Sequence, residues 1–302
     1  MSAGQRLPGT PEPMYTIDTD AGLRLAADAW GDPDAPLVML LHGGGQTRHA
    51  WKGAGEALGA AGYRAVAFDA RGHGDSDWAG EGGYEQGVMV DDLNAMIRAF
   101  GDRPAALVGA SMGGGVGLLA AGERRADVSA LVLVDIAPQM EHDGVARIMA
   151  FMQRHADGFA SLDEVAEAIQ GYQPHRRRSA NPEGLAKNVR QGSDGRYYWH
   201  WDPAFLQVRR DFEMRRQRLE NGARQLRVPT LLVRGALSDV LSEAGARAFL
   251  ADCPHAEYVN VSDASHMVAG DGNDIFLDSV REFLGRAVVS GAGPGQRVTG
   301  GR

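Results

Sequence analysis

Three residues of this chain have the types and the order that nucleophilic catalysis by a serine requires. Ser111 lies in Gly-Ala-Ser-Met-Gly, Asp239 in Leu-Ser-Asp-Val and His266 in Ala-Ser-His-Met. A serine hydroxyl is a weak nucleophile until a base takes its proton, and a carboxylate can hold that base in place. We therefore interpret Ser111 as the nucleophile, His266 as the base and Asp239 as the carboxylate.

The setting of Ser111 favours this role. The apolar run 104–110 before it predicts a buried strand, and the spacing of 112–125 after it predicts a helix. A strand that turns at once into a helix is crowded, and the glycines at 109 and 113 would relieve that crowding. The hydroxyl is then expected at the carboxyl edge of a sheet, near the positive end of a helix.

A second carboxylate competes with Asp239. Asp135 ends the apolar run 130–136 and could also approach His266, whereas Asp239 follows the run 228–235. We favour Asp239 and keep Asp135 as its rival.

An acyl-transfer mechanism also needs two backbone N–H groups that hold the oxyanion. One is expected from Met112, directly after the nucleophile. The other is expected from the glycines that follow His42, with Gly44 preferred and Gly45 next, because glycine lets the backbone approach a substrate closely. His42 itself is expected to bond to the backbone.

Five further residues are candidates for contact with substrate: Gly43, Gly45, Trp51, Trp199 and Trp201. The two glycines belong to the loop after the first core strand, and Trp51 follows that loop. Trp199 and Trp201 lie in the aromatic stretch 195–205, which could form a pocket wall. The alternative for these two tryptophans is that they anchor a small core of their own.

Along the chain, short apolar runs alternate with stretches in which apolar residues have helical spacing. Such runs predict strands buried on both faces of a parallel sheet, and an antiparallel hairpin with its turn near Gly22 is expected at one edge. The runs occupy residues 37–42, 64–70, 104–110, 130–136, 228–235 and 255–261. Helices are expected over residues 51–62, 87–100, 112–125 and 274–284.

The segment 138–227 breaks this alternation, because it is helical in pattern and supplies no buried strand. We predict a helical lid over the carboxyl ends of the strands, where ligands bind in open α/β sheets. The core then comprises 14–137 and 228–287, and the glycine-rich tail 288–302 is expected to be disordered.

Composition excludes several functional classes. A net charge of −8 argues against a general affinity for nucleic acid or an anionic membrane. The single cysteine cannot form an internal disulfide, and no apolar run is long enough to cross a bilayer. We expect a cytoplasmic protein that acts on a small molecule.

The motifs LLHGGG, FDARGHGDSD, VGASMGG, LLVRGALSD and ASHMVAGD occur in this order over roughly residues 14 to 287. In this respect the chain resembles the lidded branch of the α/β-hydrolase superfamily, which includes microbial esterases, meta-cleavage product hydrolases, epoxide hydrolases and haloalkane dehalogenases. The resemblance implies a mostly parallel eight-stranded sheet flanked by helices, with the lid inserted after the sixth strand.

The resemblance also narrows the reaction. Epoxide hydrolases and dehalogenases of this branch use an aspartate nucleophile, whereas position 111 is serine. Many meta-cleavage hydrolases carry tryptophan after the catalytic histidine, whereas Met267 stands here. The expected function is hydrolysis of an ester or lactone, without metal or cofactor, by a monomer or homodimer. The alternatives are C–C bond hydrolysis of the meta-cleavage type and a non-catalytic small-molecule receptor.

Overall fold

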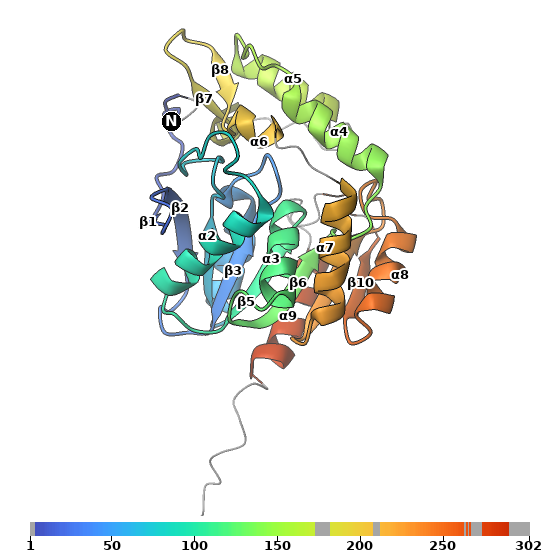
Figure 1. The fold of residues 1–302 in the computed structure, drawn as a ribbon. Helices are drawn as coiled ribbons and strands as arrows, with labels where there is room; N and C mark the ends of the chain where they lie inside the picture. The colour runs from blue at the N-terminus through green and yellow to red at the C-terminus, as the bar shows by residue number, and fades with distance from the viewer. Residues whose placement is uncertain are drawn as a thin grey trace, which may run out of the picture.

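The computed structural model describes residues 4–172, 182–207, 212–262, 264, 266 and 274–289. Within these ranges the main sheet has eight strands in the order β1-β2-β4-β3-β5-β6-β9-β10 (Figure 1). The pairs β1–β2 and β2–β4 are antiparallel and the other five are parallel, which confirms the expected architecture. The strands are β1 (Tyr15–Asp18), β2 (Arg24–Trp30), β3 (Leu37–Leu41), β4 (Arg64–Phe68), β5 (Ala105–Ala110), β6 (Val128–Val134), β9 (Thr230–Gly235) and β10 (Glu257–Val261).

The central strands are mostly apolar because both of their faces are covered. Every residue of β3, β4, β5 and β9 is buried. On one face of the sheet, the helices α1 (Lys52–Ala60) and α9 (Asp274–Val289) contribute to the core. The opposite face is covered by α2 (Gln86–Ala99), α3 (Met112–Gly122), α7 (Phe212–Gln225) and α8 (Glu243–Asp252).

The antiparallel edge forms as expected. The turn between β1 and β2 contains Gly22, whose φ is +74°, and its N–H donates to the carbonyl of Thr19. Glycine adopts this left-handed conformation without the strain that a Cβ atom would add.

The insertion after β6 contains helices and a short hairpin. Its elements are α4 (His142–Gln153), α5 (Leu162–Tyr172), the 3-10 segment η2 (Pro182–Asn188), β7 (Val189–Gln191), β8 (Tyr197–Trp199), α6 (Pro203–Gln207) and α7. Figure 1 shows α4, α5, α6 and the hairpin above the sheet.

The insertion differs from the expectation at its end. The helix α7 packs against α3 of the core, where a Cβ atom on Gly122 would lie 2.5 Å from the carbonyl oxygen of Gly222. The segment 138–227, predicted as a lid, thus includes a helix that packs on the core. The name lid is kept for the rest of the insertion, from α4 to α6, and its role as a cover for the site stays a prediction. Of the predicted tail 288–302, residues up to Val289 continue α9, and the rest lies outside the described residues.

Within the ranges that the structure describes, no helix has the length and apolar character needed to cross a membrane.

Candidate active site

Ser111 occupies the sharp connection between β5 and α3. Its φ of +46° and ψ of −111° are strained values for a residue with a side chain. A Cβ atom on Gly109 would lie 2.6 Å from the carbonyl oxygen of Gly113, and one on Gly113 would lie 2.5 Å from that of Leu41. These distances confirm that only glycine fits on either side of the turn.

His266 is held by Asp135. The Nδ1 atom of His266 lies 2.7 Å from Oδ2 of Asp135, whose side chain is fully buried. The same carboxylate accepts a 2.5 Å hydrogen bond from the hydroxyl of Ser238 and a 3.0 Å bond from the N–H of Gly235. Because a carboxylate only accepts, His266 donates from Nδ1, and its Nε2 atom is left as the basic nitrogen.

The expectation that Asp239 would hold His266 is wrong. The carboxylate of Asp239 is 53% exposed and pairs with Arg147 of α4, at 2.7 Å from Nη2 and 3.1 Å from Nε. A Cβ atom on Gly144 would lie 2.1 Å from the carbonyl oxygen of Asp239, so α4 rests directly on this loop. Asp239 connects the lid to the core and does not reach the histidine.

Sheet register explains why Asp135 lies beside the nucleophile. Ala110 of β5 is paired with Val134 of β6, so Ser111 and Asp135 each leave the sheet one residue after a matched pair. The N–H of Ser111 donates to the carbonyl of Val134 at 3.2 Å, which ties the two strand ends together. Parallel strands thus bring the two side chains to the same edge.

The glycine loop after β3 forms a tight turn. The N–H of Gln46 donates to the carbonyl of Gly43 at 3.1 Å, and the Gln46 side chain accepts from the N–H of Gly43 at 2.8 Å. Gly45, the third residue of the turn, has a φ of +73°, which favours glycine. A Cβ atom on Gly43 would lie 3.4 Å from the Ser111 Cβ, so the turn borders the nucleophile.

The two expected oxyanion donors are the N–H group of Met112, in α3, and that of Gly44, in the glycine turn. Met112 is the first residue of α3, and the first N–H groups of a helix have no acceptor within the helix. The N–H of Gly44 makes no hydrogen bond to the backbone of another described residue. The two N–H groups remain the predicted oxyanion donors.

His42 supports this loop, as expected. Its Nδ1 atom bonds to the carbonyl of Gly43 at 2.8 Å, and its Nε2 atom accepts from the N–H of Ala70 at 2.9 Å. Burial lowers the pKa of His42 below its ordinary value of 6.5, in keeping with a neutral ring.

The three tryptophans have different surroundings. Trp51 is buried in the core on the α1 and α9 face, 6.3 Å from the ring of Phe276, so its expected place in the substrate pocket is wrong. Trp199 stacks on Trp201 with ring centroids 4.8 Å apart, and both are buried, as the alternative of a lid core predicts. Trp201 also reaches the turn, because a Cβ atom on Gly45 would lie 3.5 Å from its Cζ3 atom.

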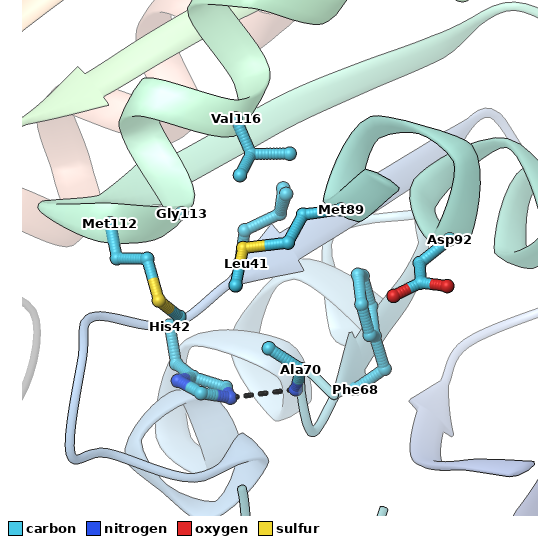
Figure 2. A pocket seen from close by; sticks show the side chains of 9 residues that line it. All are labelled: Leu41, His42, Phe68, Ala70, Met89, Asp92, Met112, Gly113 and Val116. Atoms are coloured by element: carbon cyan, nitrogen blue, oxygen red, sulfur yellow. Dashed lines mark hydrogen bonds between the residues drawn. The ribbon is translucent and has the colours of Figure 1, made fainter. Parts of the chain in front are cut away.

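A small cavity adjoins Met112 and Gly113 (Figure 2). Its polar side chains are already bonded: His42 as described, and Asp92 to Arg71 through two bonds of 2.6 and 2.7 Å. The remaining lining is apolar. It consists of Leu41, Phe68, Ala70, Met89 and Val116.

Two residues with a place in this architecture were missed from the sequence. Ser238 bonds to Asp135, and His200 of the lid contacts the glycine turn. Of the neighbouring residues Ser238 and Asp239, the sequence prediction chose Asp239 for the catalytic group, whereas Ser238 is the one that bonds to Asp135. Among the described residues, no group of three histidine, cysteine or carboxylate side chains is arranged to hold a metal ion.

Comparisons with known proteins agree with this fold. The chain is 30% identical to a 3-hydroxybutyrate-oligomer hydrolase of Cupriavidus necator, over 82% of this chain and 88% of the relative. It is 27% identical to an esterase of Mycobacterium tuberculosis, over 91% of each chain. The crystal structure of E-2-(acetamidomethylene)succinate hydrolase superposes with a TM-score of 0.79 at 25% identity, over 90% of this chain and 99% of the other. Residues 36–272 match the family model of the α/β hydrolase fold, and the chain therefore belongs to the α/β-hydrolase family.

Proposed function

We propose that this hydrolase cleaves a carboxylic ester or lactone of a small molecule through an acyl-enzyme on Ser111. The observation that carries the proposal is the hydrogen bond from His266 to the buried Asp135, at the strand ends where Ser111 is held in its strained turn. In a serine hydrolase, a carboxylate holds the imidazole that takes the proton of the serine hydroxyl.

In the first half-reaction, Nε2 of His266 takes the proton of Ser111 as the hydroxyl oxygen attacks the carbonyl carbon. Asp135 stabilises the imidazolium that forms and keeps its ring oriented. The C–O bond to the alcohol then breaks, and the alcohol leaves with the proton from His266.

In the second half-reaction, His266 removes a proton from water, which attacks the acyl carbon. The bond to the Ser111 oxygen breaks, the serine regains its proton and the acid leaves. In both steps the N–H groups of Met112 and Gly44 hold the oxyanion, and the amino end of α3 favours its negative charge.

The relatives support an ester as the bond that is cleaved. One is named as a 3-hydroxybutyrate-oligomer hydrolase and another as an esterase.

Hydrolysis of p-nitrophenyl acetate and butyrate tests the proposal, with Ser111→Ala as the matched control. We expect steady turnover by the wild-type protein and a loss of roughly 10⁶-fold in kcat for the variant, as when other serine hydrolases lose their nucleophile. Equal turnover by both proteins would contradict the proposal.

Two other results would favour the alternative functions. Turnover of a dienoate diketone without turnover of esters would indicate C–C bond hydrolysis by the same residues. If neither substrate is turned over and a fluorophosphonate adds no mass to the folded wild-type protein, the receptor function would be favoured.

A further inference from the structure

His200 of the lid forms hydrogen bonds with two loops of the core. It lies in the connection between β8 and α6 and is fully buried. Its Nδ1 atom accepts from the N–H of Gly74 at 2.8 Å, and its Nε2 atom lies 3.2 Å from the carbonyl oxygen of Gly45. One side chain thus joins the lid, the loop after β4 and the glycine turn.

The partners determine which nitrogen of His200 carries the proton. The N–H of Gly74 can only donate, so Nδ1 is the acceptor, and Nε2 therefore donates to the carbonyl of Gly45. Burial, together with the nearby His73 and Arg190, lowers the pKa of His200 well below 6.5. The ring is neutral, and both of its nitrogens are used.

The Gly45 carbonyl is coupled to the expected oxyanion donor through two peptide planes. It lies in one plane with the N–H of Gln46, which donates to the carbonyl of Gly43. The Gly43 carbonyl in turn lies in one plane with the N–H of Gly44. Because Gly45 lacks a Cβ atom, its carbonyl rotates easily once the bond to His200 is lost, and the Gln46–Gly43 hydrogen bond would transmit that rotation to the Gly44 N–H.

We propose that His200 is a positioning residue of the oxyanion hole, acting through its hydrogen bond to the Gly45 carbonyl. The inference rests on the proposed function, because it assigns the Gly44 N–H to the oxyanion. It adds that the lid residue acts on kcat by orienting a backbone donor without touching substrate.

Two amide substitutions separate the two hydrogen bonds of the ring. The side-chain oxygen of His200→Asn can accept from Gly74 but leaves nothing at the Nε2 position to donate to Gly45. The longer side chain of His200→Gln places an N–H₂ group within reach of the Gly45 carbonyl. The matched control is Tyr84→Phe, which removes the bond from Tyr84 to Asp202, another contact of the same lid segment with the core.

The experiment measures kcat and KM on p-nitrophenyl butyrate for all three variants, wild type and Ser111→Ala, after near-UV circular dichroism has established folding. We expect His200→Asn to lower kcat about 10- to 100-fold with KM nearly unchanged, since a donor displaced by a fraction of an ångström stabilises the transition state less. His200→Gln should retain most of kcat, and Tyr84→Phe should match wild type.

Three results would overturn the inference alone: wild-type kcat in His200→Asn, equal losses in both His200 variants, or the same loss in Tyr84→Phe. If His200→Asn does not fold, His200→Gln decides, because retained kcat supports the role and a loss above tenfold overturns it. A wild type without Ser111-dependent turnover would overturn the proposed function and this inference together.

Discussion

Two aspartates follow neighbouring strands of the sheet and have opposite environments. Asp135 comes directly after β6, is fully buried and accepts hydrogen bonds from Gly235, Ser238 and His266. Asp239 comes four residues after the end of β9, is half exposed and pairs with Arg147.

The difference shows how strand position decides the role of a carboxylate. A residue that directly follows a central strand stays at the sheet edge, between the strands on either side of it. A residue several positions into a loop can leave that edge, and Asp239 does so to meet the lid. The first position suits a group that holds a histidine, and the second suits a contact between lid and core.

The largest effect that would test this comparison is expected from Asp135→Asn. An amide has one acceptor oxygen, so its N–H₂ group must face either His266 or the N–H of Gly235. In the first case Nδ1 of His266 must become the acceptor, and Nε2 then carries the proton and cannot act as the base. We expect kcat to fall about 10⁴-fold, as in other triads that receive the wrong tautomer. Steady-state kinetics on p-nitrophenyl butyrate measure this, and a loss below tenfold would break the assignment.

A smaller effect is expected from Ser238→Ala. The substitution removes one of the three hydrogen bonds to Asp135 and leaves the carboxylate and the bond to His266 in place. A hydrogen bond to a charged group is worth about 1.5–3 kcal/mol, and only part of it acts on the oriented histidine, so kcat should fall about tenfold. Threonine at position 238 retains the hydroxyl and should restore most of the rate; equal rates in the alanine and threonine variants would argue against this role.

The smallest effect is expected from Asp239→Asn. Exposed ion pairs contribute little, because water screens them. We expect kcat/KM within about threefold of wild type, and the same for Arg147→Met, which breaks the pair from the lid side. A loss of 100-fold in Asp239→Asn but not in Arg147→Met would instead place Asp239 in the catalytic machinery.

The fold and the sharp turn at Ser111 could be predicted from the sequence because local signals determine them. Buried parallel strands such as 37–42 are continuous apolar runs, and crowding around Ser111 admits only glycine at 109 and 113. These requirements act between residues that are close along the chain or in neighbouring strands.

The remaining features depend on packing between distant segments. Trp51 lies near the glycine loop in sequence, yet it packs in the core beside α9, more than 200 residues away. The contact of His200 with Gly45 joins residues that are 155 positions apart. The choice between Asp135 and Asp239 also depends on α4, which lies on the loop of Asp239 and pairs with its carboxylate through Arg147. The sequence alone does not show this contact.

The most direct test of the central claim is the rate at which a small fluorophosphonate adds its mass to the protein, followed by intact-mass spectrometry. Wild type, Asp135→Asn, Asp239→Asn and Ser111→Ala would be compared side by side. The account predicts one adduct that forms at similar rates in wild type and Asp239→Asn, far more slowly in Asp135→Asn, and not at all in Ser111→Ala. Slow labelling of Asp239→Asn with wild-type labelling of Asp135→Asn would contradict it.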